Sequence, residues 1–68
     1  MVLKISHGCL YLEKSLATPR MLEFLDNHKD YVQVESFDNY YIMYGAPSNL
    51  FYFLQEAART FSVELIAH

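Results

Sequence analysis

The stretch from Tyr31 to Gly45 constrains the fold more than any other part of the chain. It contains two runs rich in β-branched and aromatic residues, joined by Asp38-Asn39. Asp and Asn tolerate the left-handed conformations that a tight hairpin requires, so we predict a β-hairpin with a two-residue turn. Phe37 then pairs with Tyr40, and every other pair follows from that register.

This register sorts the hairpin side chains into two faces, because successive side chains of a strand point in opposite directions. The first face is mostly aliphatic and suits burial under helices; it contains Val32, Val34, Ser36, Tyr41, Met43 and Gly45. The second face mixes aromatic rings with polar groups; it contains Tyr31, Gln33, Glu35, Phe37, Tyr40, Ile42 and Tyr44. A mixed face of this kind is expected to be exposed or covered by a partner.

Residues 2–14 have an extended pattern whose alternation changes phase at His7-Gly8. A bulge at Gly8 would keep one long strand with its leucines on the core side. Alternatively, His7-Gly8 is a tight turn that pairs Ile5 with Leu10 in a small N-terminal hairpin. The residues leave both interpretations open.

Two helices follow from start signals and apolar spacing. Thr18 is a predicted N-cap before a proline at the first helical position, which indicates a helix from Pro19 to about Lys29. Ser48 is the expected N-cap of a second helix. The core stripe of that second helix comprises Leu50, Leu54, Ala57 and Phe61. Residues 62–67 alternate as a final strand.

The resulting order is strand, helix, strand, strand, helix, strand, within one domain spanning residues 1–68. This is the β-α-β-β-α-β order of ferredoxin-like α+β domains, in which two helices pack on one face of an antiparallel sheet. The hairpin interpretation of His7-Gly8 adds an extra N-terminal strand. Right-handed crossovers would place the first and third strands of the basic pattern in the middle.

Charge and cysteine usage exclude several functional classes. The net charge of -3, with five Lys plus Arg, disfavours nucleic acid and anionic membrane surfaces as partners. No signal peptide and no apolar run long enough for a membrane span is recognised. Cys9 is the single cysteine and has no internal disulfide partner. We therefore expect a cytoplasmic protein.

Few residues offer catalytic or ligand-binding chemistry. His7 and Cys9 would be a nucleophile with its base or half a metal site, but a buried thiol beside a turn is the simpler interpretation. The expectation is therefore no catalytic residue, no metal and no cofactor. Gly45, Ser48 and Asn49 form the one candidate ligand loop, because backbone N–H groups at a helix start attract anions.

The strongest functional signal is the set of aromatic residues expected on the sheet face away from the helices. Five rings there would offer about 750 to 1,250 Å², against about 300 to 600 Å² for the largest patch on a typical monomer. The predicted partner-binding residues are Tyr11, Tyr31, Phe37, Tyr40, Ile42 and Tyr44. We expect a non-enzymatic protein-interaction or regulatory module that pairs with itself or with another protein. The alternative is a small-molecule or amino-acid sensing domain similar to the ACT type.

Overall fold

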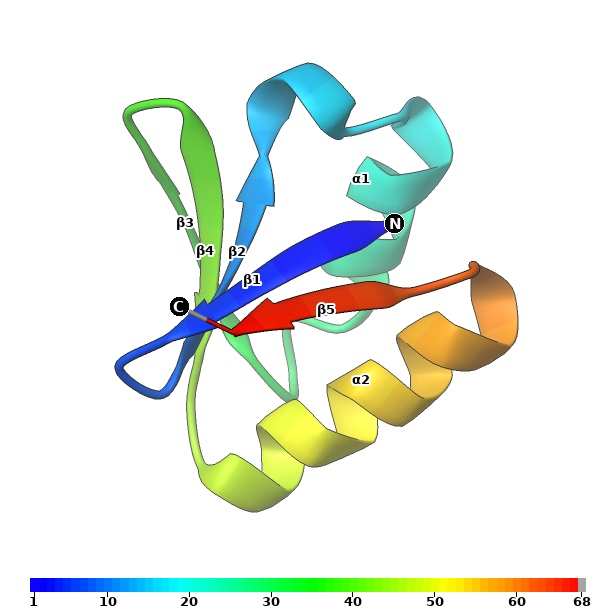
Figure 1. The fold of residues 1–68 in the computed structure, drawn as a ribbon. Coiled ribbons are helices and arrows are strands. Elements are labelled where there is room, and N and C mark those ends of the chain that lie inside the picture. Colours follow the sequence, from blue (N-terminus) through cyan, green and yellow to red (C-terminus); the bar gives the residue numbers. More distant parts are fainter. Residues whose placement is uncertain (68) are drawn as a thin grey trace.

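The computed structural model describes residues 1–67, which form five strands and two α-helices (Figure 1). A short 3-10 turn, Lys14–Leu16, precedes the first helix. Along the chain the elements are β1 (Val2–Ser6), β2 (Cys9–Glu13), α1 (Pro19–Asn27), β3 (Gln33–Phe37), β4 (Tyr40–Tyr44), α2 (Pro47–Thr60) and β5 (Glu64–Ala67). The predicted α+β class is confirmed.

The strands form one open sheet in the order β3-β4-β2-β1-β5. Three of the pairings are antiparallel, whereas β5 runs parallel to β1. The expectation of a wholly antiparallel sheet was therefore wrong. The difference arises because β1 occupies the place beside β2 and moves β5 one position outward. The sheet is compatible with a ferredoxin-like arrangement and differs from it in this strand order.

His7-Gly8 is a hairpin turn between β1 and β2, which resolves the two interpretations left open by the sequence. Ser6 lies opposite Cys9, and Ile5 lies opposite Leu10. His7 has a φ of 52° and Gly8 a φ of 75°. Two successive left-handed residues are what a two-residue turn needs to match the twist of its strands.

The register predicted for the second hairpin is confirmed. Phe37 lies opposite Tyr40, and the pairing continues to Gln33 opposite Tyr44. Asp38, the first turn residue, has a φ of 51°, a conformation that Asp tolerates better than most side chains. A short turn therefore fixes which side chains of β3 and β4 share a face.

The helix starts agree with the sequence in one case and differ in the other. The Thr18 hydroxyl accepts a hydrogen bond from the Met21 N–H at 3.3 Å, so the predicted cap of α1 is confirmed. Ser48 is not the cap of α2, because that helix already begins at Pro47 with Ala46 before it. The fixed φ and missing N–H of proline suit the first helical position. Within residues 1–67, neither helix has the length and apolar character needed to cross a membrane.

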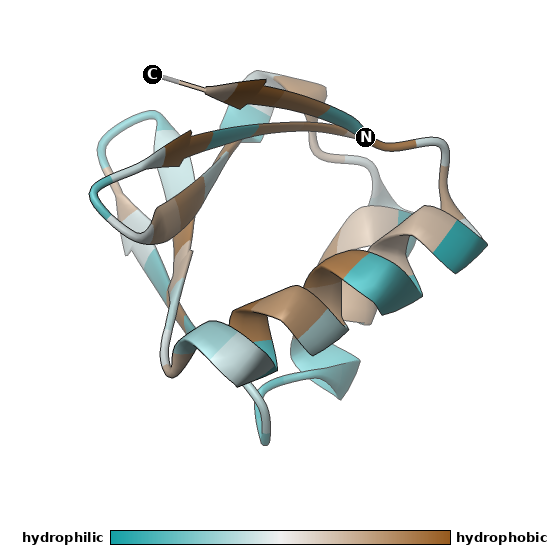
Figure 2. Cartoon of the chain, turned by 60° about the horizontal axis from the view of Figure 1, so that its bottom comes forward, coloured by the Kyte–Doolittle hydropathy of each residue, from teal (hydrophilic) through white to brown (hydrophobic). Residues whose placement is uncertain are grey.

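The hydrophobic core lies between the sheet and the two helices, which pack on the same side of it (Figure 2). Phe53 of α2 is fully buried, and its ring lies 5.3 Å from that of Phe24 on α1. Of the residues described, the buried apolar side chains are Leu3, Leu10, Leu12, Phe24, Leu25, Val32, Met43, Phe53 and Ala57. The predicted burial of Val32 and Met43 beneath the helices is confirmed.

Leu12 and Leu16 are a matched pair for testing this core. Leu12 is fully buried, whereas the Leu16 side chain is 48% exposed. Leu12→Ala should lower the free energy of unfolding by about 2 to 5 kcal/mol, because it removes buried methyl groups and leaves a cavity. Leu16→Ala should change it by no more than about 0.5 kcal/mol. Urea denaturation of both variants measures the difference, and equal losses would contradict the assigned core.

Candidate functional site

The sheet has one side that faces away from both helices, and we call this side the open face. Leu10 and Leu12 of β2 are buried toward the helices, so Tyr11 between them points to the open face. Met43 of β4 is likewise buried, which places its neighbours on the other side. The middle of the open face comprises Lys4, Tyr11, Glu13, Tyr40, Ile42 and Tyr44, with Phe37 at the β3 edge.

Cross-strand pairing aligns these side chains in rows. One row crosses all five strands, from Glu35 through Ile42, Tyr11 and Lys4 to Ile66. Neighbours in such a row lie within side-chain contact distance. The open face is therefore a continuous surface of aromatic, aliphatic and charged groups that are held in register by the backbone.

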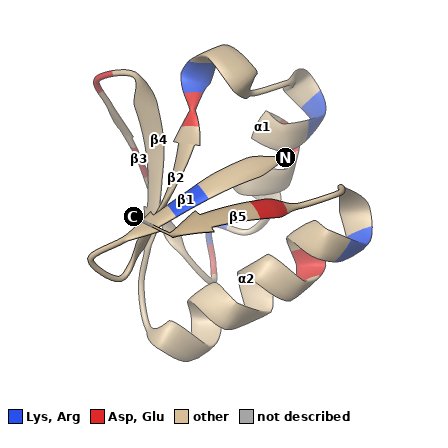
Figure 3. Cartoon of the chain, viewed as in Figure 1, with Lys and Arg blue, Asp and Glu red and all other residues tan. Residues whose placement is uncertain are grey.

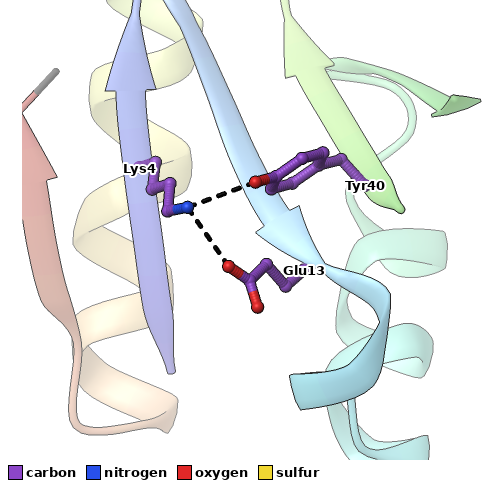
Figure 4. Close-up of polar contacts among 3 residues, drawn as sticks. All are labelled: Lys4, Glu13 and Tyr40. Atoms are coloured by element: carbon purple, nitrogen blue, oxygen red, sulfur yellow. Dashed lines mark hydrogen bonds and ion pairs between the residues drawn. The ribbon is translucent and has the colours of Figure 1, made fainter. Parts of the chain in front are cut away.

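Lys4 is the centre of the polar contacts on the open face (Figure 4). Its Nζ donates to Glu13 Oε1 at 3.1 Å and to the Tyr40 hydroxyl at 3.2 Å. The Tyr40 hydroxyl and then the Glu13 carboxylate raise the pKa of Lys4 above its usual 10.5. Tyr40 in turn meets Tyr11 edge to face, with ring centroids 5.9 Å apart. These contacts link side chains of three adjacent strands, β1, β2 and β4, and they fix the orientation of the Tyr11 and Tyr40 rings.

A second polar contact links the edge strand to its neighbour. The Tyr44 hydroxyl donates to Glu35 Oε1 at 2.8 Å. This hydrogen bond raises the pKa of Tyr44 above its usual 10.0, because loss of the proton would break the bond and set two negative charges side by side.

The structure brings five of the six predicted partner-binding residues together on the open face, namely Tyr11, Phe37, Tyr40, Ile42 and Tyr44. Phe37 is the most exposed of them, at 67%. The other four are partly exposed. The exposed apolar ring of Phe37 shares the open face with tyrosines, whose rings are apolar and whose hydroxyls are polar. This combination is typical of surfaces that contact other proteins.

Tyr31 was wrongly assigned to this surface. It precedes β3, and its ring lies 4.9 Å from that of Tyr52 on α2 and 6.2 Å from that of His28. The alternation of strand faces does not extend to Tyr31, because the strand begins only at Gln33. Tyr31 therefore packs beside the helices.

The candidate ligand loop lies beside an apolar hollow. Asn49 N–H already donates to Ala46 O at 3.0 Å within the first turn of α2. The neighbouring hollow, of about 240 Å³, is lined by Ile5, Gly8, Pro47, Leu50, Phe51 and Leu54. Because its lining is almost wholly apolar, this hollow suits an apolar side chain better than an anion.

His7 and Cys9 lie at the turn between β1 and β2. His7 Nδ1 is 2.9 Å from the Ser6 hydroxyl, and the Cys9 thiol is free and partly exposed. Among residues 1–67, no group of three or more His, Cys, Asp or Glu side chains is placed to hold a metal ion.

Lys4 was not identified from the sequence as a residue of the open face, although one of the two interpretations of His7-Gly8 places it there. If His7-Gly8 is a two-residue turn, Lys4 must lie opposite Tyr11 and share its face, as it does. A decision for the turn over the bulge at His7-Gly8 would therefore have identified Lys4.

Titration of Tyr44 tests the hydrogen bond to Glu35. A pKa raised in the folded state means that the contact stabilises the fold fully below about pH 10 and that this stabilisation is lost as the pH rises through the folded pKa. Glu35→Gln should return the Tyr44 pKa toward 10.0. The NMR signals of the Tyr44 ring, followed against pH, measure this change. An unchanged Tyr44 pKa in the variant would contradict the contact.

No model of a known protein family matches the chain, and no curated protein or solved structure is significantly similar to it.

Proposed function

We propose that this chain is a small, non-enzymatic protein-interaction module that forms a homodimer through the open face. The observation that carries the proposal is an ordered surface of aromatic and aliphatic side chains on the central strands β2 and β4, with no helix of residues 1–67 above it. These side chains are Tyr11, Tyr40, Ile42 and Tyr44. Tyrosine is enriched at the energetically dominant positions of protein interfaces, because its ring is large and its hydroxyl remains satisfied.

The area available supports a contact between two copies. A standard interface buries about 800 Å² on each partner. The described chain exposes 4492 Å² in all, so one such contact uses less than a fifth of its surface. A five-stranded sheet in a body of 27 × 24 × 20 Å offers a face of this order. A dimer would also add stability to a domain of this small size.

The charges on the open face favour a protein partner. Lys4 and Glu13 neutralise each other, and Glu35 accepts a hydrogen bond from Tyr44. Charged groups that already have partners cost less to remove from water. Lys and Arg residues are scattered over separate elements (Figure 3), so the sheet has no basic patch to bind phosphates.

We infer that the fold is a ferredoxin-like sheet with one inserted strand. The order of β2, α1, β3, β4, α2 and β5 follows the β-α-β-β-α-β pattern, and β4 lies between β2 and β3. Removal of β1 from the strand order would leave β5 beside β2 and antiparallel to it, as in that pattern. A regulatory role in the cytoplasm belongs to the same proposal; the unpaired thiol of Cys9 suits a reducing compartment.

The second candidate is a sensor that holds a small molecule between subunits, as the ACT-type alternative implies. Two hollows flank Tyr40 at the open face. One, of about 390 Å³, is lined by Glu13, Lys14, Ser15, Asn39 and Tyr40. The other, of about 230 Å³, is lined by Lys4, Ser6, Tyr11 and Tyr40. A second copy over the open face would enclose both of them.

The double variant Tyr40→Ser/Tyr44→Ser tests the homodimer. Truncating two rings per subunit should weaken the contact at least about 100-fold. At about tenfold above the wild-type dissociation constant, the wild-type contact should be mostly formed and the variant contact mostly lost, so the mean mass should fall toward half. Sedimentation equilibrium measures the mass, and circular dichroism checks that the helices remain.

Tyr52→Ser is the matched control, because Tyr52 lies on α2 and is 39% exposed on the other side of the molecule. It should leave the mass unchanged. A wild-type chain that remains at 8.0 kDa at high micromolar concentration would contradict the homodimer. If the double variant has the same mass as the wild-type assembly, the contact lies on another surface.

A further inference from the structure

The outer edge of β5 presents backbone groups that no strand of residues 1–67 pairs. β5 is the last strand of the sheet and pairs with β1 alone (Figure 1). Glu64 N–H donates to Met1 O at 2.9 Å, so Glu64 faces β1. In a parallel ladder the N–H and C=O of one residue point to the same neighbour and alternate along the strand. Leu65 and Ala67 therefore direct their backbone groups outward.

The side chains next to this edge are apolar and exposed to solvent. Leu65 lies in register with Leu3, so both point toward the helices, yet Leu3 is fully buried and Leu65 is 48% exposed. The apolar hollow between β1 and α2 lies beside the end of β5, since Ile5 lines it and pairs with Ala67. Phe51, which also lines this hollow, is 64% exposed.

We propose that β5 pairs antiparallel with β5 of a second copy, around a two-fold axis at Leu65, and so joins two sheets edge to edge. This interface is separate from the open face and does not depend on it. Unpaired strand edges are ready templates for another strand, and proteins protect them with charged side chains, Pro, bulges or very short strands. β5 is short and has one charged side chain, Glu64, at its start. It carries no Pro, and its pairing with β1 runs without a bulge, so the edge at Leu65 and Ile66 has no charge to protect it.

The residue order of β5 fits its own copy in this register. Residues that lie opposite each other in an antiparallel pair must point to the same face of the sheet. A two-fold axis at Leu65 meets this requirement, because it sets Leu65 opposite Leu65 and Glu64 opposite Ile66 of the other copy. Leu65 then exchanges two backbone hydrogen bonds with Leu65 of the partner subunit, because its N–H and C=O both point outward. On the open-face side, Glu64 lies opposite the partner's Ile66, so that no acidic side chain faces another.

The opposite edge of the sheet lacks this self-complementarity. β3 runs from Gln33 to Phe37 with Glu35 at its centre. The equivalent centred register would set Glu35 directly opposite Glu35 of the partner subunit, and like charges in that position are destabilising. The comparison favours β5 as the pairing edge.

The test uses the Tyr40→Ser/Tyr44→Ser chain, so that contact through the open face does not contribute. This chain should sediment as a dimer at high micromolar concentration. Leu65→Lys, added to it, should weaken dimerisation at least about tenfold, because the two-fold axis places the two ammonium groups opposite each other. Leu22→Lys is the matched control on α1, where Leu22 is 38% exposed, and should leave the mass unchanged.

Amide hydrogen exchange distinguishes strand pairing from side-chain contact. In the same background, raising the protein concentration should slow exchange at Leu65 and Ala67, whose amides point outward. The Ile66 amide, directed at β1, should change less. Two results on mass would overturn the edge pairing: a monomeric Tyr40→Ser/Tyr44→Ser chain, or a mass that Leu65→Lys does not change. Rapid exchange of the Leu65 and Ala67 amides at every protein concentration would overturn it as well. The open face is tested separately, by the fall in mass between the wild-type chain, in which both interfaces can form, and the Tyr40→Ser/Tyr44→Ser chain, in which only the β5 edge remains.

Discussion

The packing of both helices on one side of the sheet is the constraint on which the rest of the structure depends. Phe53 of α2 and Phe24 of α1 contact each other in a core cluster that also includes Leu12 and Met43 of the sheet. Every strand residue that points into this core has a neighbour that points away from it. Burial of one face of the sheet therefore leaves a second face of equal extent that the helices do not cover. The residue types at the alternate strand positions determine the chemistry of that second face.

On the open face, Lys4, Glu13, Tyr40, Tyr44 and Glu35 already have hydrogen-bond partners within the chain before any partner binds. Lys4 joins β1 to β2 and β4 through Glu13 and Tyr40, and Tyr44 joins β4 to β3 through Glu35. Such links hold aromatic rings in fixed orientations, which lowers the entropy lost when a partner binds. The central surface is thus pre-organised, while the β5 edge offers backbone groups that are still unpaired.

Local rules allowed much of this fold to be predicted from the sequence. Asp38-Asn39 fixed the register of β3 and β4, and Thr18 fixed the start of α1, because turn and cap chemistry act within a few residues. Other features of the fold escaped prediction. A phase change at His7-Gly8 fits a bulge as well as a turn, and only pairing between strands separates them. Tyr31 lay beyond the strand end, where alternation no longer applies. The parallel pairing of β5 with β1 is set by tertiary packing, which leaves no local pattern.

Isotope-filtered NMR on an equimolar mixture of carbon-13-labelled and unlabelled chain tests the central claim, that a second copy covers the open face. Tyr11, Tyr40, Ile42 and Tyr44 should show intermolecular NOEs, since their side chains would lie at the middle of the contact. Tyr52 should show none, because it packs against Tyr31 beside the helices. Intermolecular NOEs confined to helix residues, or none from the open face at millimolar concentration, would contradict the claim.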